Sequence, residues 1–291
     1  MRKCPKFFFI FSNIFKHLLF ISRILPNFTT IPDILDVLDA HSGFVFESYG
    51  YNMKAISLLE NLLTLNNLKL LQFIYHISWS IDDIFFKCRY KDKIIDCNDL
   101  FQISSTYRGF CLSFNLNQTA FYSSKKFTKR YAHSGLRNGL SLMLYYNDSN
   151  FDRLHSYSHG FRIMIQETNT YPSAHSSIKF IPLNEEVFIA LRPTETFCSQ
   201  AVKNLAFADR QCVFPYEEKL TFFHTYSGAN CELNCRINMM LKYCNCYTYF
   251  FFNNKTSNPI CEYKDIPCLV DNFGRLRKPS LNPTPAPLTA L

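Results

Sequence analysis

Glycine is scarce in this 291-residue chain, which has eight glycines against 30 phenylalanines and 17 tyrosines. Phosphate-binding loops need closely spaced glycines, and neither G-x-G-x-x-G nor G-x-x-x-x-G-K-[ST] occurs in the sequence. The signatures H-E-x-x-H and G-x-S-x-G are also missing. We therefore expect no enzyme, no catalytic residues and no cofactor. The aromatic residues, within 47% hydrophobic content, instead predict a β-rich protein that buries a sizeable core.

Acidic residues are fewer than basic ones, which gives a formal net charge of +8. The densest basic group is "SSKKFTKR", which contains Lys125, Lys126, Lys129 and Arg130, and the other basic residues are scattered. A solvated loop explains this group better than a nucleic-acid site does. No nucleic-acid partner is expected.

A clean apolar run long enough to span a membrane is also lacking. Basic residues precede the run Phe7–Phe15, as in a signal peptide. Read as a span, residues 7–25 contain Lys16 and Arg23, and each costs about 2.5–3.5 kcal/mol near a helix centre. We expect residues 1–30 to be a signal-anchor-like or degenerate first membrane segment, and we expect no clear transmembrane helix.

Cysteine, by contrast, is abundant, with 12 in the chain. The C-terminal cluster lacks both a nearby histidine and repeated C-x2-C modules, so no metal site is predicted and zinc is the less favoured alternative to disulfides. So many cysteines favour an oxidising compartment. Sequons that predict glycosylation agree with an extracellular location and begin at Asn27, Asn117, Asn147 and Asn254.

Apolar periodicity changes along the chain. A helical period in residues 53–77 and again from residue 217 predicts helices, and the second places Cys231 and Cys235 on one helix face. Period-two alternation predicts half-buried antiparallel strands that contain Leu140, Leu142 and Leu144, then Phe161, Ile163 and Ile165, then Val187, Ile189 and Leu191. The expected fold is α+β: a disulfide-rich antiparallel β-sheet core with helical additions. Residues 271–291 have the composition of a disordered tail.

Several specific segments occur in one order: "FKCRYKDKIIDCNDLFQISSTYRGFCLSFN" (86–115), "RNGLSLMLYYN" (137–147), "HGFRIMIQETNTYP" (159–172), "RQCVFPYEEKLTFFHTYSGANCELNCR" (210–236) and "LKYCNC" (241–246). Together they resemble the extracellular domain of the degenerin and epithelial sodium channel superfamily, and the insect pickpocket-type subunits are the most similar branch. The resemblance covers residues 84–270 and leaves residues 31–83 as a divergent helical region. It implies a hand-like ectodomain, here partial, of a non-voltage-gated, amiloride-sensitive sodium channel. Such a subunit forms a homo- or hetero-trimer with related subunits in the plasma membrane and faces the extracellular side.

The resemblance also implies a disulfide pairing. Carried over to this chain, the pairs are Cys88–Cys97, Cys244–Cys268 and Cys246–Cys261. Four further cysteines would be orphans whose family partners have no counterpart in these 291 residues: Cys111, Cys212, Cys231 and Cys235. The family's second membrane helix and selectivity filter also have no counterpart, so we expect a truncated subunit that forms no pore alone.

Two alternatives stay open. The chain could be a secreted cysteine-rich binding module without transport activity. The carboxylate pairs Glu185-Glu186 and Glu217-Glu218 could sense protons if crowding raised their pKa values, although solvated ends of strands and helices are the default interpretation.

Overall fold

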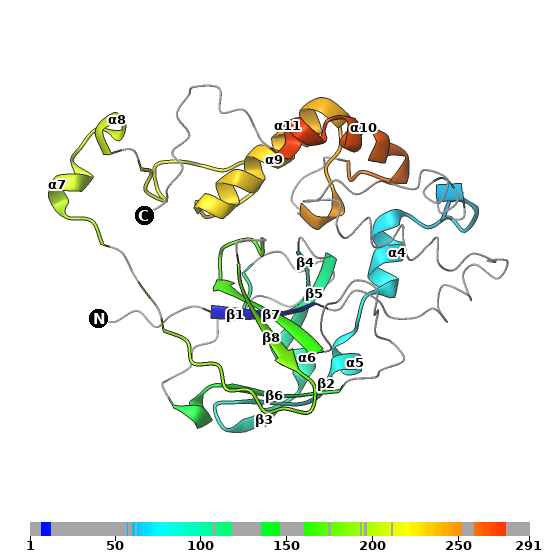
Figure 1. The fold of residues 1–291 in the computed structure, drawn as a ribbon, viewed down its shortest axis with the longest axis vertical. Helices are drawn as coiled ribbons and strands as arrows, with labels where there is room; N and C mark the ends of the chain where they lie inside the picture. The colour runs from blue at the N-terminus through cyan, green and yellow to red at the C-terminus, as the bar shows by residue number, and fades with distance from the viewer. Residues whose placement is uncertain are drawn as a thin grey trace.

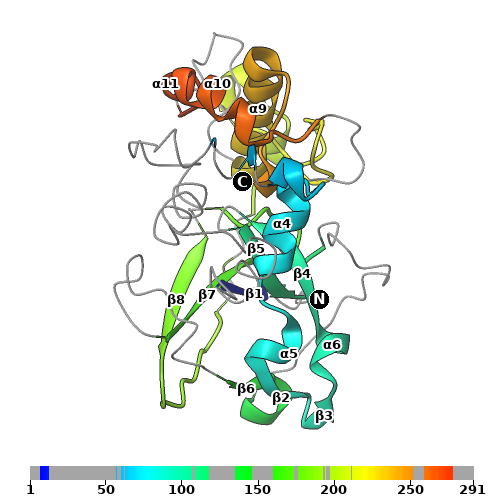
Figure 2. The same cartoon turned by 90° about the vertical axis from the view of Figure 1, so that its right-hand side faces the viewer.

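The computed structural model of the chain describes residues 7–12, 57, 60–61, 63–106, 109–117, 135–145, 160–173, 176–192, 194, 197–210, 212–251 and 259–277. In this part of the chain, a five-stranded sheet lies between a layer of helices and a smaller three-stranded sheet (Figure 1 and Figure 2). The two sheets are antiparallel, and the described residues form three disulfides. The expected disulfide-rich α+β fold is confirmed.

The large sheet has the strand order β4-β5-β1-β7-β8. Its strands are β1 (Phe7–Ser12), β4 (Phe101–Thr106), β5 (Gly109–Phe114), β7 (Gly160–Glu167) and β8 (Ser177–Pro182). The predicted strand around Ile163 is β7. It is buried on both faces rather than one, because Ile163 is 3% exposed on one face and Met164 is 0% exposed on the other.

Strand β1 occupies the middle of the large sheet, where Phe9 pairs with Phe114 of β5 and with Ile165 of β7. The apolar run near the N-terminus therefore contributes at least this strand to the sheet. The rest of the segment expected over residues 1–30 lies outside the described residues, so its relation to a membrane stays a prediction. None of the helices in the described part is long and apolar enough to cross a bilayer.

The small sheet has the order β3-β2-β6 and consists of β2 (Phe85–Tyr90), β3 (Lys93–Ile95) and β6 (Leu140–Leu144). Leu140, Leu142 and Leu144 of β6 alternate toward the core, as predicted. Two short helices, α5 (Ile81–Ile84) and α6 (Cys97–Leu100), flank β2. Aromatic and aliphatic side chains fill the space between the two sheets, and Phe85 stacks on Phe101 there with ring centroids 4.2 Å apart.

The prediction of a strand over residues 187–191 is wrong. These residues form no strand in the described part of the chain, although Ile189 and Leu191 pack against the core between the sheets. Alternation requires only an extended backbone with one buried side, whereas a strand also needs a hydrogen-bonded neighbour. The strand that does form, β8, comes earlier and lies at the edge of the large sheet, where Ile178 and Phe180 remain partly exposed.

The helical layer contains α4 (Leu70–Ile77), α9 (Gly228–Cys244), α10 (Ile266–Asp271) and α11 (Phe273–Arg277), together with 3-10 turns at Tyr249–Phe251 and Tyr263–Asp265. A further 3-10 turn spans Leu136–Asn138. The helix predicted in residues 53–77 is confirmed by α4, whose Leu70 is 1% exposed. Two short helices, α7 (Gln200–Lys203) and α8 (Phe207–Arg210), lie apart from the layers (Figure 1).

Two boundaries differ from the expectation. The second long helix begins at Gly228 rather than near residue 217, because Ser227 caps it by accepting a hydrogen bond from the Asn230 backbone. The tail expected to be disordered from residue 271 contains α11, whose Leu276 is 6% exposed and packs in the core. Residues 278–291 lie outside the described residues.

The Asn230 side chain joins α9 to the end of strand β7. It is 0% exposed, and its Oδ1 accepts a hydrogen bond from the Tyr171 backbone N–H at 2.8 Å. Its Nδ2 donates to the carbonyl oxygens of Asn169 at 3.0 Å and Thr225 at 2.9 Å. One buried amide thus satisfies three backbone groups from two different segments.

We expect Asn230→Ala to destabilise the fold by about 3 kcal/mol, because each buried polar group left without a partner costs about 1–3 kcal/mol. Denaturant unfolding followed by tyrosine fluorescence measures this change. Asn238→Ala, at an exposed position on the same helix, is the matched control and should change stability by less than about 0.5 kcal/mol. Equal losses in the two variants would contradict the assigned role of Asn230.

Candidate functional site

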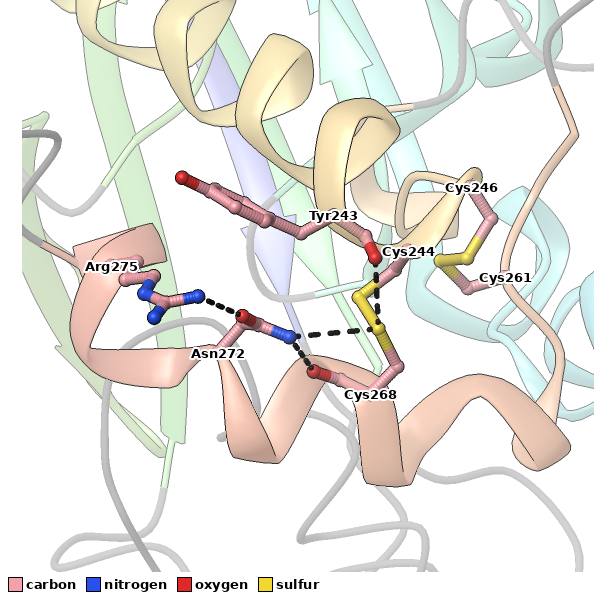
Figure 3. Close-up of a disulfide and its surroundings, with 7 residues drawn as sticks. All are labelled: Tyr243, Cys244, Cys246, Cys261, Cys268, Asn272 and Arg275. Carbon is pink, nitrogen blue, oxygen red and sulfur yellow. Dashed lines mark hydrogen bonds between the residues drawn. A yellow bond between two sulfur atoms is a disulfide. The ribbon is translucent and has the colours of Figure 1, made fainter.

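Two disulfides hold the C-terminal end of α9. Their cysteines at this end, Cys244 and Cys246, are separated by a single residue and bond different partners. The helix ends at Asn245, which has a left-handed backbone conformation (φ 56°). Cys244, on one side of Asn245, bonds Cys268 of α10, and Cys246, on the other side, bonds Cys261 (Figure 3). The Cα–Cα distances are 5.8 Å and 5.0 Å, which is ordinary disulfide geometry.

A third disulfide, Cys88–Cys97, joins β2 to the start of α6 across a Cα–Cα distance of 5.3 Å. These three bonds are the pairs that the family resemblance implies. In the chain-entropy account, bridges that close loops of this length contribute about 3 kcal/mol each.

The outer disulfide of the helical layer, Cys244–Cys268, is only half-buried and has polar neighbours (Figure 3). Asn272 donates to the Cys268 carbonyl oxygen at 2.9 Å, and Arg275 donates to the Asn272 side-chain oxygen at 3.2 Å. The guanidinium of Arg275 also lies 5.3 Å from the ring centroid of Tyr243, in a cation–π arrangement. These contacts fasten α11 to the end of α9.

The inner disulfide, Cys246–Cys261, is buried, with each cysteine 4% exposed. Backbone hydrogen bonds flank it, from Tyr247 N–H to the Pro259 carbonyl and from Cys261 N–H to the Tyr247 carbonyl. The next residue, Glu262, accepts a hydrogen bond at 3.0 Å from the backbone N–H of Leu70 at the start of α4. The inner disulfide therefore positions a carboxylate that holds α4 in place, 192 residues away in sequence.

The remaining described cysteines are not brought together in pairs. Cys198, Cys212, Cys231 and Cys235 form no disulfide among the described residues. Cys111 is buried in β5, and its sulfur lies 3.2 Å from the Thr106 hydroxyl. The missing-partner interpretation of Cys111, Cys212, Cys231 and Cys235 stays a prediction. Among the described residues, no cluster of three histidine, cysteine or carboxylate side chains could hold a metal ion.

The carboxylate of Glu217 does not fit the proton-sensing alternative. Its pKa is lowered rather than raised, because it accepts a hydrogen bond from the Phe214 backbone N–H at 2.9 Å and is paired with Arg210. Arg210 also donates to the carbonyl oxygens of Cys212 and Leu205. The ion pair of Arg210 and Glu217 therefore holds several backbone groups of this loop together. Hydrophobic periodicity in the sequence could not have predicted these polar contacts, because they join residues of an irregular loop. Glu185 and Glu186 are exposed.

One of the predicted glycosylation sites lies in the described part of the chain. Asn117 is exposed just after β5, and its side-chain amide donates to the Asn169 side-chain oxygen at 2.9 Å. Asn27, Asn147 and Asn254 lie outside the described residues. Glycan attachment at all four stays a prediction.

We expect the outer disulfide to be reduced before the inner one. Thiol exchange requires a reductant thiolate to reach a sulfur atom, and Cys244 and Cys268 are half-buried whereas Cys246 and Cys261 are almost fully buried. Graded dithiothreitol, followed by alkylation and peptide mass mapping, gives the order. Opening of Cys246–Cys261 at the lower reductant concentration would refute the assignment of inner and outer bonds.

The thiol of Cys235 should react slowly with alkylating agents at neutral pH. Its pKa is raised, first by burial and then by the neighbouring Cys231. The iodoacetamide rate at Cys235 as a function of pH should therefore have its midpoint above the usual cysteine range. Cys231→Ser should lower this midpoint in part, and Cys198→Ser, on the distant α7 segment, should leave it unchanged. A midpoint near neutral pH would contradict the raised pKa that partial burial and Cys231 give to Cys235.

Comparison with known proteins identifies the family of the chain. The family model described as "Amiloride-sensitive sodium channel" matches residues 17–283. "Sodium channel protein Nach" of Drosophila ananassae is 50% identical over 252 residues, covering 87% of this chain and 48% of that protein. The protein of the same name in Drosophila melanogaster is 43% identical over 289 residues, covering 94% and 54%. "Pickpocket protein 11" of Drosophila melanogaster is 26% identical over 223 residues, covering 76% and 40%.

The chain thus spans about half the length of the curated relatives it matches. The family model covers most of the chain, and the disulfides and motifs lie within the matched region. The chain therefore belongs to the amiloride-sensitive sodium channel family, in the degenerin and epithelial sodium channel superfamily, as an insect pickpocket-type subunit.

Proposed function

We propose that this chain is the extracellular part of a subunit of a non-voltage-gated, amiloride-sensitive sodium channel in the plasma membrane. The observation that carries the proposal is the match of residues 17–283 to the sodium channel family. Disulfides of this number also need an oxidising compartment, which supports exposure on the extracellular face.

The packing of the domain supports a role in passing on an extracellular stimulus. Helix α9 is fixed at its start by Asn230 and at its end by Cys244, and Glu262 connects the inner disulfide to α4. A force or ligand that moves one helix of this layer would move the others with it, because packed elements shift as units rather than deforming continuously. In this proposal the helical layer receives the stimulus and the sheets support it.

The partners in this proposal are related subunits, with which the chain forms a homo- or hetero-trimer, and sodium ions pass through the complete channel. The family contains pickpocket paralogues such as "Pickpocket protein 11", which could supply unlike subunits.

A chimaera tests the proposal. Residues 17–283 of this chain replace the matching segment of the Drosophila melanogaster relative, in cells where the unmodified relative conducts. We expect an amiloride-sensitive sodium current of at least half the unmodified value, because equivalent domains should assemble and gate alike.

The same chimaera with Cys246→Ser and Cys261→Ser is the control and should fail to reach the cell surface, since it lacks the buried inner disulfide. A chimaera that reaches the surface in normal amounts but carries no current would favour the alternative of a binding module without transport.

A further inference from the structure

The small sheet exposes large apolar side chains that lie beside basic ones on the face turned away from the core. Ile94 of β3 pairs with Arg89 of β2, and Met143 of β6 pairs with Lys87 of β2. An irregularity in β2 between Phe85 and Lys87 also turns Phe86 to solvent. The exposed fractions are 66% for Ile94, 55% for Met143 and 73% for Phe86. We call Phe86, Lys87, Arg89, Ile94 and Met143 the outer face.

This exposure contrasts with the inner face of the same sheet. Cys88 and Tyr90 are 1% and 7% exposed and pack in the core between the sheets, so the sheet already has a buried side. An antiparallel sheet with one buried side normally carries polar residues on the other. Single exposed apolar residues are ordinary at a surface, whereas this small sheet exposes three large ones, Phe86, Ile94 and Met143.

The charge around the outer face is predominantly positive. Lys87, Arg89, Lys91 and Lys93 are all exposed on β2, on β3 or in the turn between them. The nearby carboxylates are engaged: Asp92 lies 3.7 Å from Arg89, and Asp96 accepts a hydrogen bond from the Asn98 backbone. A partner that carries carboxylates beside apolar side chains is complementary to this surface.

The same chain presents such a segment. Glu185 and Glu186 are exposed, and neither has an ion pair among the described residues. Val187 and Phe188 follow, 39% and 64% exposed. The next apolar residue, Ile189, turns inward and packs in the core between the two sheets. Within one copy this segment is therefore anchored through Ile189 at the core between the two sheets.

We propose that the outer face of one copy binds residues 185–188 of a second copy. The carboxylates of Glu185 and Glu186 pair with Lys87 and Arg89, and Phe188 packs against the exposed apolar side chains. Because the two surfaces differ, the contact is heterologous, and repeated contacts close into a ring when the rotation permits. This inference rests on the subunit assembly in the proposed function, and it adds which surfaces of the two copies are in contact.

Photo-crosslinking tests the contact directly. The full chain carries benzoylphenylalanine in place of Phe188 in one tagged copy and is co-expressed with a second copy that carries a different tag. We expect adducts between the two tags, mapped by mass spectrometry to residues 86–94 or 140–145 of the second copy. Adducts within one copy, adducts elsewhere on the second copy, or no association of the two copies would each overturn the proposal.

Charge reversal gives an independent measurement. Lys87→Glu with Arg89→Glu in both copies should reduce co-precipitation of the two tags at least tenfold, and adding Glu185→Lys with Glu186→Lys to one of the two copies should restore most of it. Lys242→Glu with Lys264→Glu, at exposed positions in the helical layer, is the matched control and should have no effect. An intact Cys88–Cys97 disulfide in the first variant shows that the small sheet has folded. Unchanged co-precipitation of a folded variant contradicts the contact.

The two proposals fail separately. If the chimaeric channel conducts while the adduct maps elsewhere, the channel function stands and this contact is wrong. If the adduct forms as expected while the chimaera carries no current, the contact stands without the channel function.

Discussion

The position of the helical layer depends on one buried amide. Asn230 holds the start of α9 against the loop that follows β7, and its buried side chain does so by satisfying three backbone groups. An apolar side chain of similar size would fill the same space but would leave those groups unpaired, at a cost larger than any packing gain. The residue type is therefore dictated by the backbone that surrounds it.

Once α9 is placed, aromatic packing fills the space beneath it. Tyr171 contacts the rings of Phe223 and Phe251, with centroids 6.2 Å and 5.6 Å apart, and Phe110 of β5 contacts Tyr249 at 6.0 Å. Burial raises the pKa of the Tyr249 hydroxyl well above its usual range, because the ionised phenolate would lose its hydration there. The large aromatic content thus forms the contact between the sheet and the helices, and the disulfides hold the far end of α9 on that contact.

Local sequence patterns predicted where helices and buried segments lie more reliably than they predicted which segments pair with one another. The alternation of Leu140, Leu142 and Leu144 and the helical period around Leu70 both describe how one segment buries one side, and both predictions held. The same alternation at Ile189 and Leu191 led to a false strand, because no neighbouring strand pairs with that segment in the described part of the chain. Proton sensing at Glu217 failed because the loop brings the Phe214 backbone N–H and the Arg210 guanidinium to its carboxylate, and a sequence pattern does not show these contacts.

The sequence by itself determined the fold class, the oxidised state expected of the cysteines and, through its motifs, the family. Composition, the spacing of residues and the order of motifs are enough to predict these properties. None of the three depends on contacts between residues that are distant in the sequence. Only the tertiary structure decided that Asn230 meets Tyr171, that Glu262 caps α4, and that Glu217 is held charged by Phe214 and Arg210. Each of these contacts depends on where the backbone places a donor and an acceptor, and for Asn230 and Glu262 the two groups are tens to hundreds of residues apart, where periodicity carries no information.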